Sequence, residues 1–283
     1  MLSFLTVAGA LVCRPNATSM PIITSRHNAI VARYRAASRG ESSDTMLVDG
    51  AHLVADALAA GIPIREAAVT TAHERDPLVD ALRASGVDVA AVSPPVMNAI
   101  SPVRTSSGIV ALVRRPPAEA RVYETAPALV LVAVDIQDPG NLGAIVRAAE
   151  AAGASGVVAA GACADPFGWK ALRGSMGSAL RLPIAVARTA DEAIADARRH
   201  GCRIVAASPH DGRPFFEADL QGASAVVVGG EGAGVPPSIL AAADDRVTIP
   251  MEAPVESLNT AVAAALLLYE ARRQRTSHLM STR

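Results

Sequence analysis

The chain alternates short apolar stretches with longer runs in which apolar residues recur at helical spacing. In the second half, apolar stretches near 129–135, 155–160, 183–187, 202–207, 225–229 and 246–249 predict strands, and the runs between most of them predict helices. Nearly continuous apolar strands that alternate with helices are typical of a parallel sheet covered on both faces. We therefore expect a parallel α/β domain in this half.

A smaller α/β pattern runs from Ile22 to about Val113. It is followed by RRPPAEARVYETAP, which carries prolines and charges without an apolar period and has the composition of a linker. Length alone also favours about two domains. The pattern predicts a first domain over 20–113, a linker over 114–127, a second domain over 128–275 and a tail over 276–283.

The formal net charge of −1 gives no general attraction to nucleic acid, so such contacts would need a local patch. One candidate patch consists of four arginines that precede the first acid of the region: Arg26, Arg33, Arg35 and Arg39. The spacing of Arg35 and Arg39 puts both on one helical face. A solvated helix surface explains the same residues equally well.

Three cysteines without C-x-x-C spacing predict neither a metal site nor a disulfide framework, and they fit a reducing cytoplasm. Residues 1–19 contain an apolar run that is too short to span a bilayer and has no basic residue before it. We interpret these residues as a disordered extension. Met20 is an alternative start, which N-terminal sequencing of the native protein would decide.

The most informative stretch is VLVAVDIQDPGNLGAIVRAAEAAG, in which an apolar strand meets a polar turn and an Ala-rich helix. Open α/β sheets bind ligands at this end of their strands, and Gly140 and Gly143 permit close backbone approach. Asn141 is a candidate helix cap, and Arg147 follows two turns into the helix.

Two more strand ends carry polar loops, VGGEGAGV at 228–235 and IPMEAPVESLN at 249–259. The first is not the G-x-G-x-x-G pattern of dinucleotide binding, and two prolines follow it directly, so we reject a Rossmann cofactor site. Three such loops can meet in one site.

Taken together, N-x-G-x-x-x-R, G-G-E-G-x-G and I-P-M-x(5)-S-L-N, in this order over about 120 residues, resemble the motifs of the SPOUT methyltransferases, and most closely those of the SpoU or TrmH family of RNA ribose 2′-O-methyltransferases. The segment DPFGWKALRGSMGSALRLPI at 165–184 also resembles the family. The first half resembles, more loosely, the ribosomal protein L30e-like substrate-binding domain of these enzymes. The resemblance implies a SPOUT domain with a parallel sheet and a C-terminal trefoil knot.

The resemblance implies S-adenosylmethionine as cofactor and a set of site residues. The cofactor would contact Gly229, Gly230, Gly234, Ile249, Met251 and Leu258. The catalytic candidates are Asn141, Arg147, Glu231, Ser257 and Asn259. Arg147 is expected to orient a phosphate and polarise the 2′-hydroxyl, because a guanidinium stays protonated and is a poor base. Glu231 is expected to pair with Arg147 or to accept from a ribose hydroxyl. Helix capping competes as a role for Asn141, Ser257 and Asn259.

RNA is the implied partner, with ribosomal RNA preferred because the extra N-terminal domain usually accompanies large-subunit targets. Lys170 and Arg173 are candidate contacts to its backbone, although ordinary surface charge explains them equally well. Aromatic residues make up only 3% of the chain, which favours recognition by shape and phosphate contacts. The helix after Leu258 is apolar on most sides, and with the resemblance this indicates a homodimer that shares its active site.

Other functions stay open at this point. A tRNA methyltransferase would share the motifs, and so would an antibiotic-resistance methyltransferase that acts on one rRNA nucleotide. A non-catalytic RNA-binding or ribosome-assembly protein could retain the fold, although the presence of Asn141, Arg147, Glu231 and Asn259 argues against a decayed enzyme. We expect a cytoplasmic enzyme without a metal or a membrane span.

Overall fold

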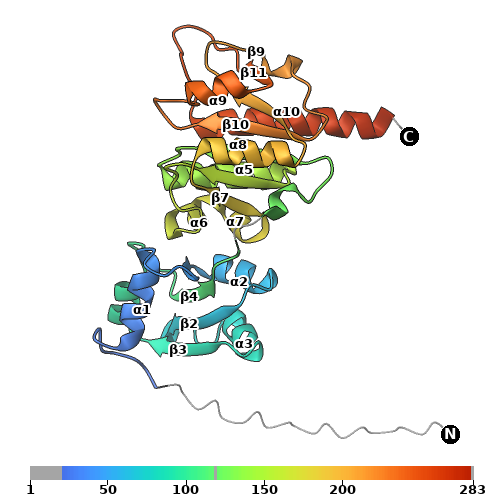
Figure 1. The fold of residues 1–283 in the computed structure, drawn as a ribbon. Coiled ribbons are helices and arrows are strands. Elements are labelled where there is room, and N and C mark those ends of the chain that lie inside the picture. The colour runs from blue at the N-terminus through green and yellow to red at the C-terminus, as the bar shows by residue number, and fades with distance from the viewer. Residues whose placement is uncertain (1–20, 118–119, 282–283) are drawn as a thin grey trace, which may run out of the picture.

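The computed structural model describes residues 21–117 and 120–281. Within these residues the strands form two sheets, one of four strands and one of seven. Figure 1 shows the smaller sheet in the N-terminal part of the chain and the larger one in the C-terminal part. The expected extension 1–19 and the alternative start at Met20 lie outside the described residues.

The N-terminal sheet has the strand order β1-β4-β2-β3 and is mixed, because β4 runs antiparallel to both neighbours whereas β2 and β3 are parallel. Its strands are β1 (Thr45–Asp49), β2 (Ile64–Thr70), β3 (Asp88–Val92) and β4 (Ile109–Arg114). The helices are α1 (Ala29–Ser38), α2 (Ala51–Ala59), α3 (Pro77–Ala84) and α4 (Pro94–Ile100), with a short 3₁₀ turn η1 (Thr71–His73). The smaller α/β unit predicted from the sequence is therefore present.

The seven-stranded sheet has the order β7-β6-β5-β10-β8-β11-β9, and every pair of neighbours is parallel. This confirms the expected parallel sheet. The strands are β5 (Leu129–Val134), β6 (Gly156–Ala160), β7 (Ile184–Ala187), β8 (Arg203–Ala207), β9 (Arg213–Pro214), β10 (Ser224–Gly229) and β11 (Asp245–Thr248). The sequence pattern missed β9, because two residues are too few to show a period.

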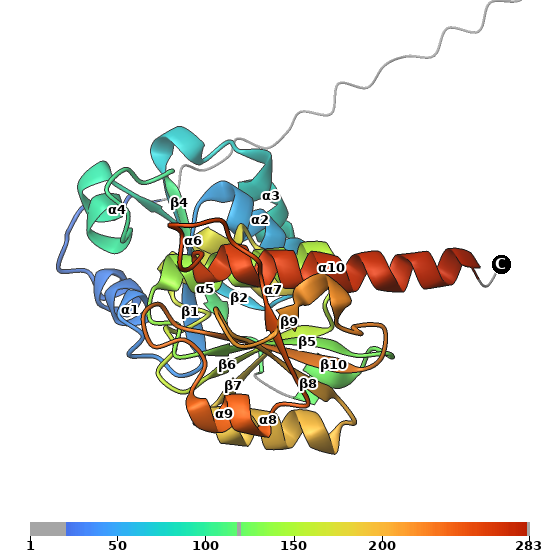
Figure 2. The ribbon, with the colours of Figure 1, turned by 90° about the horizontal axis from the view of Figure 1, so that it is seen from above.

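Helices cover both faces of this sheet (Figure 2). One face carries α5 (Pro139–Ala152), α6 (Trp169–Ser175), α7 (Ser178–Arg181) and α10 (Thr260–Ser281); the other carries α8 (Ala190–Arg199), α9 (Pro237–Ala242) and the short turn η2 (Ala120–Tyr123). A further 3₁₀ turn, η3 (Phe215–Glu217), follows β9. Alternate residues of β5 belong to the two different cores, with Leu131 on one side and Val132 on the other. Burial on both faces explains why the strands read as unbroken apolar runs.

The strand order reverses between β5 and β10, which lie side by side with Val134 opposite Gly229. The chain continues from β5 to β6 on one side, whereas β8 lies on the far side of β10. Such a reversal opens a crevice outside the carboxyl ends of the strands. The two loops that follow β5 and β10 meet there.

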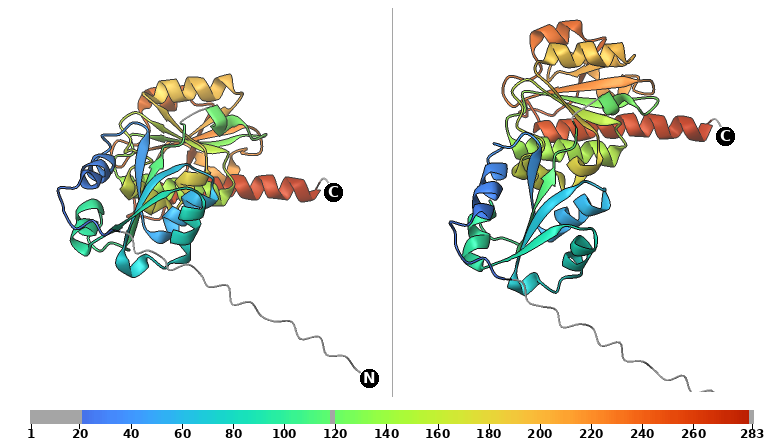
Figure 3. Two further views of the ribbon diagram at one scale, coloured as in Figure 1. Left: turned by 90° about the horizontal axis from the view of Figure 1, so that it is seen from below. Right: turned by 60° about the horizontal axis from the view of Figure 1, so that its bottom comes forward.

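The two domains touch where α6 contacts β1 and where α7 approaches α2 (Figure 3). Arg181 binds Glu150 at 2.7 Å and Asp56 of the N-terminal domain at 3.0 Å. Arg115 pairs with Asp165 on the other side of the junction. Two ion pairs and a shared apolar core therefore fix the contact between the domains.

The expected linker 114–127 is anchored at two described points. Arg115 is held as above, and Val122 of η2 is fully buried against the larger sheet. The exact domain bounds stay predictions, and so does the trefoil knot implied by the family resemblance.

Candidate active site

The first wall of the site is the turn between β5 and α5. Asp138, not Asn141, caps the helix: its Oδ1 atom accepts the backbone N–H of Asn141 at 2.7 Å. Pro139 occupies the first helical turn, where its missing N–H costs nothing and its fixed φ suits the helix. The expectation that Asn141 caps α5 is wrong, and its side-chain amide is consequently available for other contacts.

The second wall is the glycine loop after β10. A Cβ atom on Gly229 would collide with the backbone carbonyl of Gly234, so the loop can fold back on itself only with glycine at this position. The turn is closed by a 3.0 Å hydrogen bond from the N–H of Gly234 to the carbonyl of Gly230. Gly232 and Gly234 have φ angles of 90° and 65°, which side chains disfavour. Glu231 is thereby held at the tip of a tight loop.

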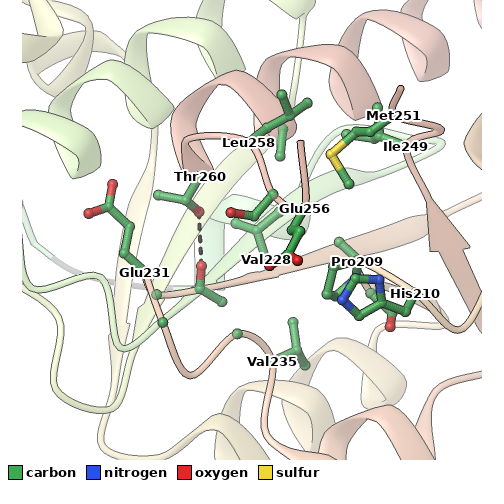
Figure 4. A pocket seen from close by; sticks show the side chains of 18 of the residues that line it. Pro209, His210, Val228, Glu231, Val235, Ile249, Met251, Glu256, Leu258 and Thr260 are labelled. Carbon is green, nitrogen blue, oxygen red and sulfur yellow. Dashed lines mark hydrogen bonds between the residues drawn. The ribbon is translucent and has the colours of Figure 1, made fainter. Parts of the chain in front are cut away.

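The third wall is the segment between β11 and α10. Asn259 caps α10, because its Oδ1 accepts the N–H of Ala261 at 3.0 Å. Ser257, the other capping candidate, makes no such bond and lies before the helix. The hydroxyl of Thr260 donates to the carbonyl of Gly229 at 2.9 Å and ties this segment to the glycine loop (Figure 4).

Three polar side chains from the three walls meet in one hydrogen-bonded group, the Asn141–Glu231–Asn259 cluster. Asn141 donates from Nδ2 to Oε1 of Glu231 at 2.7 Å, and Asn259 donates from Nδ2 to the same oxygen at 3.1 Å. Asn259 also donates to Oδ1 of Asn141 at 3.1 Å. The second carboxylate oxygen of Glu231 has no hydrogen-bond partner in the described part of the chain, so it is free to accept from a ligand.

A cavity of about 360 Å³ opens beside this cluster, between the glycine loop and the segment before α10 (Figure 4). All six residues expected to contact the cofactor line it: Gly229, Gly230, Gly234, Ile249, Met251 and Leu258. Glu231 and Ser257 line it as well, together with residues that the motif reasoning did not name, among them His210 and Thr260. Thr260 follows the third motif directly, whereas no pattern in the sequence distinguished His210.

The chemistry of this cavity suits a cationic ligand with a planar, hydrogen-bonding part. Its charged lining consists of the carboxylates of Glu231 and Glu256, with His210 as the one basic side chain among the described lining residues. The backbone N–H groups of Met251, Ser257 and Leu258 make no hydrogen bond among the described residues. Unpaired backbone N–H groups next to aliphatic side chains can donate hydrogen bonds to the edge of a heterocyclic base, while the aliphatic groups pack against its ring.

Comparison with known proteins identifies this arrangement. A family model described as the SpoU rRNA Methylase family matches residues 128–269. The chain belongs to the SpoU rRNA methylase family. A second model, the MRM3-like substrate binding domain, matches residues 35–111. The expected RNA methyltransferase and its separate N-terminal substrate-binding domain are thereby confirmed.

Several SpoU relatives resemble the chain over most of its length. An uncharacterised tRNA/rRNA methyltransferase of Synechocystis is 34% identical over 92% of this chain and 96% of that protein. The 23S rRNA guanosine 2′-O-methyltransferase RlmP of Bacillus subtilis is 32% identical over 81% of this chain and 89% of that protein. The crystal structure of an AdoMet-bound rRNA methyltransferase from Sinorhizobium meliloti has a TM-score of 0.80 at 29% identity and covers 90% of this chain and 98% of its own.

Arg147 of this SpoU chain lies outside the cavity. It follows Asn141 by six positions, which places it about 120° away around α5. Its side chain is exposed and has no hydrogen bond or ion pair among the described residues. Glu231 is bound by two asparagines instead, so the expected pairing of Glu231 with Arg147 does not occur within one chain.

A shallow apolar groove of about 470 Å³ runs between α5 and α10, next to the polar cluster. Asn141 and Asn259 stand at one end of it, and Val262, Leu266 and Tyr269 line its length. These three apolar side chains are 49%, 39% and 49% exposed. Exposed apolar side chains that line one groove make it a candidate contact surface.

The four arginines of the candidate N-terminal patch are engaged within their own domain. Arg33 makes a bidentate pair with Glu66 at 3.0 and 2.7 Å, and Arg39 pairs with Glu41 at 2.9 Å. Arg26 and Arg35 donate to backbone carbonyls of α4, at Pro95 and Ala99. Arg173 differs from all four, because its exposed side chain makes no hydrogen bond or ion pair with any described residue.

The described residues contain neither a metal-binding cluster nor a membrane-spanning helix. No three His, Cys, Asp or Glu side chains among them gather closely enough to share a metal ion. No helix in the described part of the chain is both long and apolar enough to cross a bilayer.

Proposed function

We propose that the chain transfers a methyl group from S-adenosylmethionine to a ribose 2′-hydroxyl of ribosomal RNA in the cytoplasm. The observation that carries the proposal is the cavity beside the Asn141–Glu231–Asn259 cluster, which joins carboxylates to unpaired backbone N–H groups. The similarity to RlmP and to an AdoMet-bound rRNA methyltransferase supports both the cofactor and the class of RNA. The match of a substrate-binding domain model to residues 35–111 supports a large folded RNA as target.

S-adenosylmethionine, when bound, supplies an electrophilic methyl group on a positively charged sulfur. The backbone N–H groups of Met251 and Leu258 would hold the adenine edge, and the aliphatic side chains of the cavity would exclude water from it. The free oxygen of Glu231 accepts from an ammonium or a ribose hydroxyl. Asn141 and Asn259 hold this carboxylate in position, so that little reorganisation is needed when the ligand arrives.

Arg147 acts on the RNA as a cation in this proposal. The guanidinium remains protonated at ordinary pH, so it cannot take the 2′-hydroxyl proton. It binds a phosphate next to the target ribose and polarises the hydroxyl, while a phosphate oxygen or water accepts the proton. Substitution by lysine keeps the charge but loses the two-pronged geometry, and near-normal turnover of Arg147→Lys would remove this role.

The active site is completed by a second copy of the chain. Arg147 does not line the cavity of its own chain, but its neighbour Ala148 lines the groove between α5 and α10, which exposes Val262, Leu266 and Tyr269. A two-fold contact along this groove covers the apolar face and brings the partner's arginine towards the site. Leu266→Glu should yield a monomer in sedimentation velocity. Val186→Glu, at a similarly exposed apolar position on β7, should stay dimeric.

The decisive experiment is methyl transfer to total RNA from a strain deleted for this gene. Tritiated S-adenosylmethionine should label one rRNA nucleotide as a 2′-O-methyl group, identified by nuclease mapping. Arg147→Ala should lose the label while still binding S-adenosylhomocysteine, and Arg188→Ala, whose side chain is 93% exposed and does not line the cavity, should keep it. Label in tRNA instead of rRNA would redirect the substrate assignment. Cofactor binding without any label would favour a ribosome-assembly role.

A further inference from the structure

Trp169 is the one tryptophan of the chain, and it stands at the first position of α6. Residues close to it in the chain are buried: Phe167, just before the helix, and Ala171 and Leu172, on it, are almost fully buried. Trp169 is partly exposed and is neither a member of a core cluster nor packed against one, as far as the described residues show. Its indole N–H has no hydrogen-bond partner among them.

Two exposed cations flank this indole. The Nζ atom of Lys170 lies 5.5 Å from the centre of the Trp169 ring. Arg173 is four residues further along and therefore on the same side of the helix. Neither cation has a hydrogen bond or salt bridge to another described side chain; Lys170 contacts the ring, and the charge of Arg173 partly opposes the rise that burial causes in the pKa of the Asp49 carboxyl on β1. An exposed aromatic ring accompanied by exposed cations is the arrangement that binds single-stranded nucleic acid, with the base on the ring and the cations near the phosphates.

Helix α6 is tightly connected to the active site. A Cβ atom on Gly143 of α5 would lie 2.5 Å from the carbonyl oxygen of Ala171 and 2.9 Å from the Cα atom of Gly174, so the two helices touch backbone to backbone. This contact involves the first turns of α5, which also carry Asn141. Trp169 precedes Gly174 by five residues, or about 8 Å along the helix axis. A base on the indole therefore belongs to a nucleotide close to the target ribose.

We propose that Trp169, assisted by Lys170 and Arg173, is a stacking site for one unpaired base of the RNA substrate near the methylated nucleotide. This inference rests on the proposed RNA methyltransferase function and adds the residue that holds the flanking base. It also moves the RNA contacts from the four arginines of the N-terminal domain, which are engaged with Glu66, Glu41 and α4, to the exposed side of α6.

The single tryptophan makes the proposal directly measurable, because fluorescence excited at wavelengths that the three tyrosines do not absorb reports on Trp169 alone. Titration with a single-stranded eight-nucleotide oligoadenylate should quench this fluorescence, with a midpoint equal to the dissociation constant from anisotropy of the labelled RNA. A blunt duplex of the same length, whose bases are already stacked, should cause little quenching. RNA binding without quenching would overturn the proposal, and so would the absence of any binding by the oligoadenylate.

Substitutions provide an independent test. Trp169→Ala should weaken oligoadenylate binding roughly fivefold to a hundredfold, the range expected for loss of one stacked base, whereas Trp169→Phe should stay within about threefold of the parent protein. Phe216→Ala removes an aromatic ring that is 52% exposed at η3 and should change nothing. Unchanged affinity of Trp169→Ala would contradict the stacking role.

Measurements of cofactor binding and of methyl transfer distinguish a failure of the stacking role from a failure of the proposed methyltransferase function. Calorimetry should give the same S-adenosylhomocysteine affinity for Trp169→Ala, Trp169→Phe and the parent protein, because the indole lies outside the cofactor cavity. If the parent protein methylates rRNA and Trp169→Ala binds the oligonucleotide equally well, only the stacking role fails. If neither the parent protein nor the variants methylate RNA, although the oligonucleotide quenches the fluorescence of the parent protein, the stacking role stands and the enzymatic assignment fails.

Discussion

The side-chain amide of Asn141 donates a 2.7 Å hydrogen bond to Oε1 of Glu231, although the two residues are 90 positions apart in the chain. Asn259 reaches the same oxygen from a third segment, at 3.1 Å. Both donors therefore hold one carboxylate oxygen and leave the other without a hydrogen-bond partner among the described residues. A carboxylate fixed in this way can discriminate a cationic ligand from a neutral one.

Glu231→Gln is expected to weaken S-adenosylmethionine binding about tenfold, because the substitution keeps the shape but removes a charge that faces the sulfonium or ammonium group. Binding of S-adenosylhomocysteine, which lacks the sulfonium charge, should fall less. Isothermal titration calorimetry with both ligands measures the difference, and Glu217→Gln at exposed η3 serves as control. An equal loss for both ligands would place the sulfonium group away from Glu231.

Mixing two inactive variants should restore activity if Arg147 serves the site of the partner chain. In a heterodimer of Arg147→Ala with Glu231→Ala, one site combines an intact glutamate with the arginine of the other chain. Subunit exchange in an equimolar mixture should therefore recover about a quarter of the parent activity per chain. Methyl transfer before and after exchange is the measurement. No recovery, with dimers shown by sedimentation, would mean that both residues act within one chain.

Gly143→Ala should destabilise the protein by about 1–3 kcal/mol, because the added methyl group overlaps the backbone of α6 and pushes the two helices apart. The shift also displaces Asn141, so methyl transfer should fall at temperatures at which the protein remains folded. Gly222→Ala is the matched control, since a Cβ atom there meets nothing within 4 Å. Urea unfolding curves of both variants provide the comparison, and equal stability would show that α6 adjusts without strain.

Asp49→Asn should stabilise the protein at neutral pH. Burial raises the pKa of the Asp49 carboxyl above its ordinary value, and the Ser101 hydroxyl at 2.6 Å and the charge of Arg173 only partly oppose this. The folded state therefore binds the proton more tightly than the unfolded state, so ionisation of Asp49 lowers stability as the pH rises above the ordinary pKa.

An asparagine still accepts from Ser101 but carries no charge. The stability gain of Asp49→Asn, measured by urea unfolding at about pH 7, should shrink as the pH is lowered towards the ordinary carboxyl pKa, because Asp49 of the folded parent protein then takes up its proton. Asp211→Asn, at an exposed position, should show no such dependence on pH. A variant less stable than the parent at pH 7 would mean that the attraction of Arg173 outweighs the cost of burial.

The sequence by itself determined the parallel sheet, the two-part organisation and the loops that form the site. Buried parallel strands read as apolar runs such as LVLVAV, and loops that fold back tightly or approach other backbone need glycine. Both signals depend on residues close together in the chain, so they can be recognised in the amino-acid sequence. The motifs therefore located Asn141, Glu231 and Asn259, together with the six residues now found lining the cavity.

Only the tertiary structure decided which of these groups contact one another. Glu231 binds two asparagines rather than Arg147, because α5 turns Arg147 about 120° away from Asn141. Asp138 caps α5 because Pro139 fixes where the helix begins. The arginines of α1 bind Glu66 and backbone carbonyls of α4, whereas Lys170 and Arg173 of α6 make no salt bridge among the described residues. Such pairings depend on helix rotation and on contacts between residues far apart in the chain, which composition and periodicity do not encode.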